Sequence, residues 1–160
     1  MHGKESLTLQ VSSGKDTAVH QACYQGRGDA LLWLQARVTP ESLYAPTLTK
    51  RTPLHIAAKH YNAELFEALL EMLPEEKLLL KCEVGQTALH VLACNGNPLQ
   101  LMVAALPAAA LYERDQASNT PLHYAVEFCQ TEEVEALLDA LPPEHRADPD
   151  RFGWTPLHQA

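Results

Sequence analysis

A chain of 160 residues is long enough to bury a hydrophobic core, and 46% hydrophobic with 20% charged residues is typical of a globular domain rather than a disordered chain. The formal net charge of −8 argues against a nucleic-acid or anionic-membrane surface, because phosphate neutralisation requires clustered Lys and Arg. No run of about 18 apolar residues is present, so we expect no membrane-spanning helix.

The charges are unevenly distributed along the chain. Residues 1–60 carry a small excess of Lys and Arg, whereas residues 115–150 hold nine carboxylates and a single basic residue, Arg146. Solvated helix faces would explain the acidic segment, and so would a docking site for a basic partner. Both interpretations stay open at this stage.

The cysteines and the first residues bear on the compartment. Cys23, Cys82, Cys94 and Cys129 have no CxxC spacing, which favours reduced thiols. The start of the chain lacks the apolar run of a secretory signal. We therefore expect a cytoplasmic protein.

A short motif built on Thr-Pro-Leu-His recurs along the chain. It begins at Thr52, Thr87, Thr120 and Thr155, with a degenerate copy at Thr17, so the steps are 35, 35, 33 and 35 residues. Such a period indicates a solenoid of small supersecondary units that cannot bury their apolar faces alone.

The second copy shows how each unit is predicted to fold. Thr52 is a good N-cap, and Pro53 suits the first helical position because its missing N–H costs nothing there. Leu54, Ala57 and Ala58 then share one helical face, whose small residues allow a neighbouring helix to come close.

A second helix is predicted after each of these first helices. Gly26 and Gly96 suit the tight turn between the two. Apolar residues at helical spacing follow in 65–70 and 134–138, and Pro74, Pro107 and Pro142 mark where these helices stop. Pro-Glu segments such as 74–76 predict an additional short helical turn.

These motifs resemble the ankyrin repeat, whose signature is Thr-Pro-Leu-His-x-Ala at a period of about 33 residues. The resemblance covers roughly residues 16–160 and implies an all-α solenoid of stacked helix–turn–helix units with β-turn fingers. We expect a leader over 1–15 and an ankyrin-repeat domain over 16–160. Its divisions are a degenerate capping repeat 16–48, repeats 49–83, 84–116 and 117–151, and a partial repeat 152–160. Because Ala160 falls inside the first helix of the last copy, we expect the chain to belong to a longer one whose next segment covers an apolar edge.

The family's finger pattern, Asp-x-x-Gly, is kept to different degrees. It is complete at 150–153, has Ser118 in place of Gly at 115–118, and has Cys82 in place of Asp before Thr87. The finger before Thr52 has Thr47 and Lys50 at these two positions, so its shape is not predicted.

Two kinds of residue raise the question of chemistry. Five of the eight histidines are motif positions, one per repeat, which is too far apart for chelation of one metal ion, and the resemblance implies hydrogen bonds to the motif Thr instead. His60 and His145 have no partner at ligand spacing. The acidic pairs Glu132/Glu133 and Asp148/Asp150 suit a helix start and a finger turn better than acid–base catalysis. We expect no enzyme activity, no cofactor and no metal.

The resemblance assigns partner contacts to finger positions before each Thr and to positions seven and eight after it. It therefore points to Tyr24, Arg51, Lys59, His60, Gln86, Asn95, Asn119, Glu127, Phe128, Arg151, Phe152 and Trp154. Aromatic and Arg side chains dominate interface energetics, although Phe152 and Trp154 could instead pack on a further part of the protein.

The function predicted is a protein-interaction module or scaffold that binds another protein through its concave face and finger tips. The expected partner has a basic and apolar surface, and the chain itself is expected to be monomeric. One alternative is a targeting or regulatory domain of a larger protein, for instance a bacterial effector acting in a host cytosol, with its catalytic part beyond residue 160. The other alternative is an enzyme.

Overall fold

The computed structural model describes residues 16–128 and 130–159, and all regular structure in these ranges is helical. This confirms the all-α fold class. The chain divides into two compact units on either side of Glu83 and Val84, a point that coincides with one of the predicted repeat boundaries. The leader 1–15 and Cys129 lie outside the described residues.

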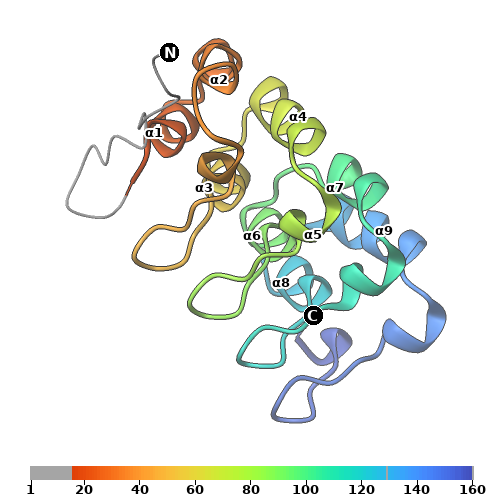
Figure 1. Ribbon diagram of the computed structural model, residues 1–160. Helices are drawn as coiled ribbons and strands as arrows, with labels where there is room; N and C mark the ends of the chain where they lie inside the picture. Colours follow the sequence, from red (N-terminus) through yellow and green to blue (C-terminus); the bar gives the residue numbers. More distant parts are fainter. Residues whose placement is uncertain (1–15, 129, 160) are drawn as a thin grey trace. The chain divides into compact units, whose positions relative to one another are not determined.

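The first unit consists of two helical pairs and two short turns. Helix α1 (Ala18–Tyr24) packs against α2 (Gly28–Gln35) and α3 (Pro53–Lys59), and α4 (Ala63–Met72) packs against α2 and α3 (Figure 1). The turns are η1 (Pro40–Leu43) and α5 (Glu75–Leu78). The side chains at the centre of this unit are fully buried: Val19, Cys23, Leu31, Leu65, Phe66 and Leu69.

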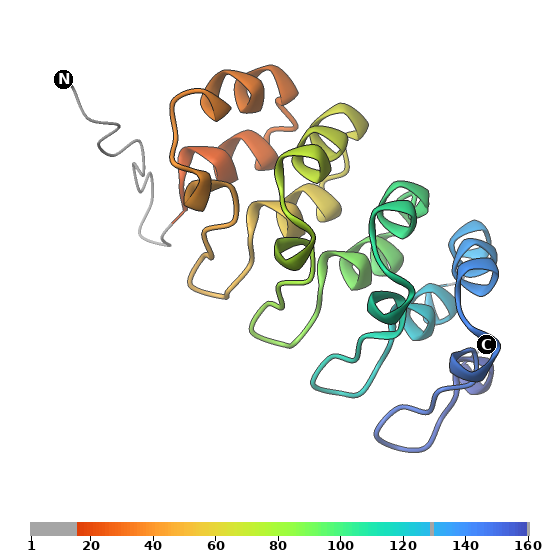
Figure 2. The same cartoon turned by 45° about the vertical axis from the view of Figure 1, so that its right-hand side comes forward.

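In the second unit, α8 (Pro121–Glu127) is the central element. It packs against α6 (Ala88–Asn95), α9 (Thr131–Ala140) and the two short 3₁₀ helices η2 (Ala108–Tyr112) and η4 (Pro156–Gln159). Helix α7 (Gln100–Ala105) packs against α9, which is followed by η3 (Pro143–His145). In this unit the loops before α8 and before η4 project on the same side as neighbouring fingers (Figure 2).

The first helix of each of the first four motif copies begins as the sequence predicts. In α1, α3, α6 and α8 the N-cap threonine accepts a hydrogen bond from the backbone N–H three residues on, and the histidine at that position accepts from the threonine N–H. Helix α6 ends at Gly96, whose φ of 64° is left-handed and favours glycine. The last copy forms only the 3₁₀ turn η4, closed by the His158 N–H donating to the Thr155 carbonyl at 2.9 Å. Bonds of this i→i+3 kind are usual in a single turn.

The prolines and short turns also follow the prediction. Helices α4, α7 and α9 all stop before a proline, and that proline directly precedes or begins a short helical turn at 75–78, 108–112 or 143–145. Within the described ranges, none of these helices has the length and apolar character needed to cross a bilayer.

The finger before Thr52 resolves the question that its sequence left open. Lys50 adopts a φ of 56°, and the Lys50 N–H donates to the Thr47 carbonyl at 3.0 Å. The Thr47 hydroxyl accepts from the Arg51 N–H at 3.2 Å, as an aspartate would at this position. Thr47 and Lys50 therefore replace Asp and Gly without a change in the turn. In the second unit Ser118 likewise replaces Gly and adopts a φ of 63°.

Candidate protein-interaction site

Buried histidines connect the first helices of the second unit to the fingers that follow them. The Nδ1 atoms of His90 and His123 accept from the Thr87 and Thr120 N–H groups, each at 3.1 Å. The ring proton is therefore assigned to Nε2. Nε2 of His90 donates to the Asn119 carbonyl at 3.2 Å, and Nε2 of His123 donates to the Trp154 carbonyl at 3.1 Å. Both ring nitrogens are used in structural bonds, which confirms the role that the resemblance implied for these two residues.

His20 differs from the other motif histidines. Its Nδ1 atom accepts from the Thr17 N–H at 3.0 Å, but its buried Nε2 makes no hydrogen bond of ordinary geometry within the described ranges. Burial is the main effect on its pKa, which lies below 6.5, although Asp16 and the backbone at Arg51 and Ala45 act in the opposite direction. Among the described residues no group of three His, Cys, Asp or Glu side chains is placed to hold a metal ion.

The last finger is held rigid by its own aspartate. The Asp150 carboxylate accepts from the Phe152 N–H at 2.8 Å and from the Trp154 N–H at 2.9 Å. The Asp150 N–H donates to the Trp154 carbonyl at 2.8 Å, and Gly153 closes the turn with a φ of 82°. The side chains of Phe152 and Trp154 therefore project from an ordered backbone.

The charge on Asp150 is favoured by the same bonds. Desolvation raises its pKa, but the amide hydrogen bonds from Trp154 and Phe152, with the positive charge of Arg151, outweigh this and lower the pKa below its usual value. Asp150 is thus an ionised group at the base of the finger.

Neighbouring fingers of the second unit are bonded to each other. The Arg151 N–H donates to the Ala117 carbonyl at 3.3 Å, and the Gln116 N–H donates to the Val84 carbonyl at 3.1 Å. Asp115 organises the middle finger as Asp150 organises the last, accepting from the Ala117 and Asn119 N–H groups at 2.8 and 2.9 Å.

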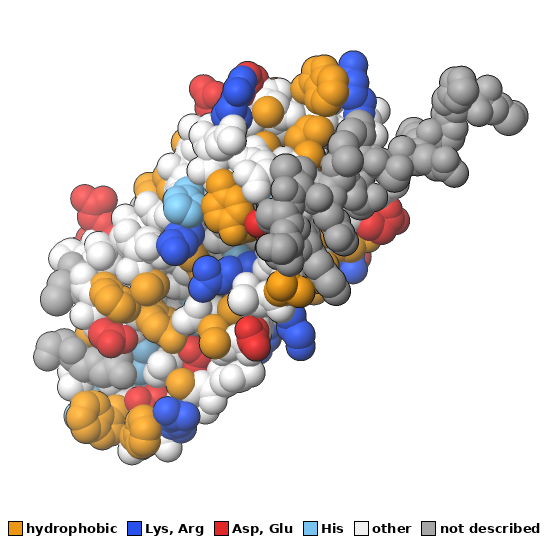
Figure 3. Space-filling model, turned by 90° about the vertical axis from the view of Figure 1, so that its left-hand side faces the viewer, with side chains coloured by type: hydrophobic (Ala, Val, Ile, Leu, Met, Phe, Trp, Pro, Cys, Tyr) orange, Lys and Arg blue, Asp and Glu red, His pale blue; other side chains and the backbone are white. Residues whose placement is uncertain are grey.

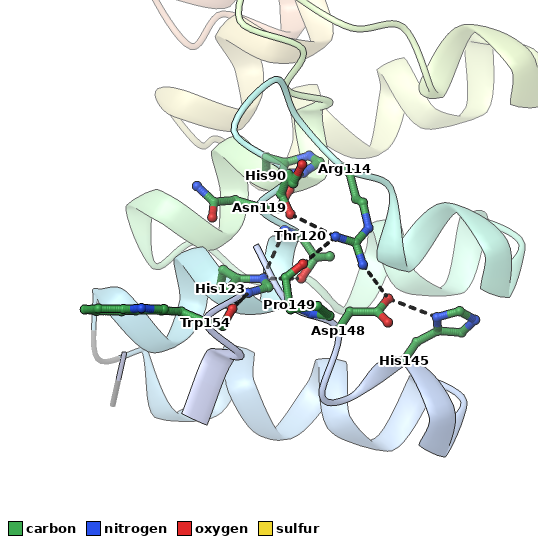
Figure 4. Close-up of polar contacts among 10 residues, drawn as sticks. His90, Arg114, Asn119, Thr120, His123, His145, Asp148, Pro149 and Trp154 are labelled. Carbon is green, nitrogen blue, oxygen red and sulfur yellow. Dashed lines mark hydrogen bonds and ion pairs between the residues drawn. The ribbon is translucent and has the colours of Figure 1, made fainter. Parts of the chain in front are cut away.

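Arg114 forms a bracket between the middle and last fingers (Figure 4). Its guanidinium donates to the carbonyls of Ser118 and Pro149, one on each finger, and lies 3.6 Å from the Asp148 carboxylate. The same carboxylate is 2.9 Å from Nδ1 of His145. The bracket therefore fixes the segment that leads into Phe152 and Trp154.

His145 also packs on Tyr112, with ring centroids 3.6 Å apart and planes 12° from parallel. The sequence analysis found no partner for this histidine at metal-ligand spacing, and the fold brings it against Tyr112, 33 positions earlier, and Asp148, three positions later. The Asp148 contact is local, whereas the Tyr112 contact is tertiary and joins two of the predicted repeats.

A cleft of about 510 Å³ lies between the two fingers and the end of α8. It is lined by Ala117, Asn119, Glu127, Asp150, Arg151, Phe152 and Trp154. Five of these seven are residues to which the family resemblance assigns partner contacts: Asn119, Glu127, Arg151, Phe152 and Trp154. The cleft thus joins two carboxylates to two aromatic rings.

The aromatic side chains beside this cleft are strongly exposed. Phe152 is 71% exposed, Trp154 is 56% and Phe128 is 46%. The space-filling view shows hydrophobic side chains gathered at the lower end of one face, next to a basic side chain (Figure 3). Phe128 is the C-cap of α8 and does not line the cleft.

The predicted contact residues of the first unit form a separate group. The rings of Tyr24 and His60 meet edge to face with centroids 5.7 Å apart. Desolvation, followed by Asp16, raises the pKa of Tyr24, while the nearby positive charge of Arg51 acts against it. Lys59 is exposed at the end of α3. This surface is basic and aromatic, in contrast to the acidic cleft of the second unit.

Two of the predicted contact residues make bonds within the second unit. The Gln86 side-chain amide donates to the Tyr124 hydroxyl at 2.9 Å, and that hydroxyl donates to the Asp115 carboxylate at 2.6 Å. Desolvation, with the Asp115 bond, raises the pKa of Tyr124 to about 12. The Asn95 side-chain amide donates to the Val91 carbonyl at 2.7 Å. Gln86 therefore supports the base of the fingers, while Asn95 stays exposed.

The residues considered for catalysis have structural positions. Glu132 is exposed while Glu133 is 7% exposed, so the two carboxylates point in different directions from α9. Asp148 belongs to the bracket and Asp150 to the finger turn. Burial raises the pKa of the Cys23 thiol to about 12, which leaves it unreactive.

An apolar groove of about 580 Å³ lies along α8, α9 and η4. Its apolar lining includes Leu122, Val126, Val134, Leu138 and Leu157, the last of which is 83% exposed.

Comparison with known proteins establishes the family. Residues 19–106 and 100–160 match the family described as ankyrin repeats (3 copies). The chain therefore belongs to the ankyrin-repeat family, whose repeats generally mediate protein–protein interactions and are typically non-catalytic.

The curated relatives are much longer proteins. Human transient receptor potential cation channel subfamily A member 1 is 32% identical over 137 residues, which cover 84% of this chain and 12% of that protein. Mouse inversin is 28% identical over 155 residues, covering 94% of this chain and 14% of that protein. Human diacylglycerol kinase iota is 31% identical over 110 residues, covering 68% and 10%. The chain thus spans between a tenth and a seventh of these relatives.

Proposed function

We propose that this chain binds a protein partner through the fingers of its second unit and the C-terminal end of α8. The observation that carries the proposal is the pair of exposed rings on one ordered turn, Phe152 at 71% and Trp154 at 56% exposure. These two large aromatic side chains are not needed for the core, and aromatic residues are enriched at interface hot spots.

The order of the finger supports a binding role. The Asp150 carboxylate bonds, the Arg114 bracket and the His123 bond to the Trp154 carbonyl restrict the backbone before any partner arrives. Binding then pays less conformational entropy, since the rings are already presented.

The charge of this region supports a basic partner. Glu127 and Asp150 lie in the same cleft as the two rings, and the segment 115–150 is strongly acidic. Complementary charge would mainly speed encounter, whereas burial of the rings would set the lifetime of the complex. The proposal assigns no catalytic step to the chain.

The proposal places the interaction in the cytoplasm. Its support is that Cys23, Cys82 and Cys94 are free thiols, as expected in a reducing compartment. A targeting role within a larger protein is a second candidate, favoured by the small share of the channel and kinase relatives that the chain matches.

The test is capture of interacting proteins by wild-type chain, by the Phe152→Ala/Trp154→Ala double variant and by Trp33→Ala. Trp33 is a matched control, because it is 55% exposed on α2 in the other unit. Proteins held by the wild type and the control but lost from the double variant, and then reproduced with the purified partner, would support the proposal. Equal capture by all three chains would refute it.

A further inference from the structure

The cleft of the second unit has the chemistry of a receptor for a cation. Its lining includes the acidic residues Glu127 and Asp150 and the aromatic residues Phe152 and Trp154. An aromatic face attracts a cation through its quadrupole, and a nearby carboxylate adds direct attraction. Carboxylates and rings occur together here in a space of about 510 Å³, on fingers that are bonded to each other.

The protein already places a cation of its own against this surface. The Arg151 guanidinium lies over the Phe152 ring, 4.9 Å from its centroid, and its charge acts on Asp150. This contact shows that the Phe152 ring is accessible to a guanidinium group. Trp154, the other ring of the cleft, has no such cation over it among the described residues.

The charge balance leaves room for a second cation. Arg151 supplies one positive charge against the two carboxylates of the cleft. The hydrogen bonds that Asp150 accepts at one oxygen from the Phe152 and Trp154 amides keep that group ionised. An incoming positive side chain would therefore meet a net negative cleft with an unoccupied indole face.

We propose that the cleft accepts an arginine side chain from the bound protein, with its guanidinium stacked on Trp154 and directed at Glu127. The assignment rests on the proposed protein-binding function and specifies its partner's chemistry. Arginine suits the cleft better than lysine because its planar guanidinium can stack on a ring while its edge donates to a carboxylate.

The probe is N-acetyl-arginine amide, titrated at constant ionic strength. The chain contains two tryptophans, so Trp33→Phe leaves Trp154 as the fluorescent reporter inside the cleft. We expect a saturable change with a dissociation constant of about 5 mM, which is reasonable for a single partly exposed side chain. N-acetyl-citrulline amide has nearly the same shape without the charge and should bind at least about fivefold more weakly.

Matched variants locate the binding within the cleft. Glu127→Gln in the Trp33→Phe background should weaken the arginine probe at least about threefold, because it removes the carboxylate that the guanidinium faces. Glu135→Gln removes the same charge from an exposed position of α9 that does not line the cleft, and it should leave binding within about 1.5-fold. Arg151→Ala removes the resident cation and should tighten binding by about twofold or more.

Three results would overturn the assignment: no saturable change, equal binding of arginine and citrulline probes, or equal losses from the Glu127 and Glu135 variants. The titration needs no protein partner. Its failure would therefore remove the arginine cleft while leaving the protein-binding proposal intact, and failed protein capture would leave a positive titration standing.

Discussion

Replacing His123 by alanine tests how the fold supports the finger. His123 is 1% exposed, and its two ring nitrogens connect the start of α8 to the last finger. The substitution removes the acceptor of the Thr120 N–H at 3.1 Å and the donor to the Trp154 carbonyl at 3.1 Å. It also leaves a space where the imidazole stood.

The magnitude follows from what remains unpaired. Thr120 is 1% exposed, so its N–H loses a partner that water cannot easily replace, which costs about 1–3 kcal/mol. The Trp154 carbonyl belongs to an exposed residue and can regain water, so its loss is smaller. With the space left by the ring, we expect the free energy of unfolding to fall by about 3 kcal/mol.

His158 provides the control. Its Nδ1 atom accepts from the Thr155 N–H at 3.1 Å in the same motif, but the residue is exposed. His158→Ala should therefore cost about 1 kcal/mol or less. Urea unfolding followed by circular dichroism measures both variants. If their free energies of unfolding fall by equal amounts, burial of the histidine is not what makes it important and the reasoning is refuted.

Three further outcomes are expected from the second unit. Burial lowers the pKa of His123 below 6.5, although the hydrogen bond to the Trp154 carbonyl acts against this shift. The stabilising contribution of the neutral ring is therefore fully present above about pH 6.5 and is lost as the pH falls towards the folded-state pKa. Unfolding curves from pH 7.5 to 5 should show a fall in the free energy of unfolding, and His123→Ala should make that fall smaller. Gly85→Ala should lower the free energy of unfolding by about 2 kcal/mol more than Gly153→Ala in the same assay. Both glycines have a φ near 80°, but only at Gly85 would the added Cβ approach a backbone nitrogen, that of Gln116, at 2.8 Å. Equal losses from the two variants would contradict this. Arg114→Gln should speed amide hydrogen exchange in residues 150–154 and leave exchange in α6 unchanged; unchanged exchange in the last finger would contradict the role given to Arg114.

The repeated helices could be predicted from the sequence because their signals are local. Thr52, Pro53 and His55 lie within one turn of each other, and the cap that they form needs no distant partner. The short turns after the second helices were also predictable, since proline both stops one helix and starts the next.

The shape of the turn at Thr47 and Lys50 could not be predicted from the sequence. The Cβ of Lys50 disfavours a φ of 56°, so the presence of Lys at this position does not predict the left-handed turn that the folded chain forms here. Ser118 also stands where the family has Gly, and the hydrogen bond from its N–H to the Asp115 carbonyl stabilises the turn against the usual preference of serine for a negative φ.

The candidate site was only partly readable. Phe152 and Trp154 stand out in the sequence because the repeat does not require aromatics there, and the structure exposes both. The pairing of Arg114 with Asp148, and the bond from Gln86 to Tyr124, join residues 34 and 38 positions apart and depend on how the fingers stack. No local pattern carries that information.

The most direct test of the account is the lifetime of the complex with a purified partner. Trp154→Ala should raise the dissociation rate at least about tenfold, which corresponds to about 1.4 kcal/mol of lost binding energy, while the helical content of the free chain stays unchanged. Trp33→Ala, with nearly the same exposure, should dissociate like the wild type. Wild-type dissociation of the Trp154 variant, or an equal acceleration by the Trp33 variant, would contradict the claim that the fingers of the second unit form the binding surface.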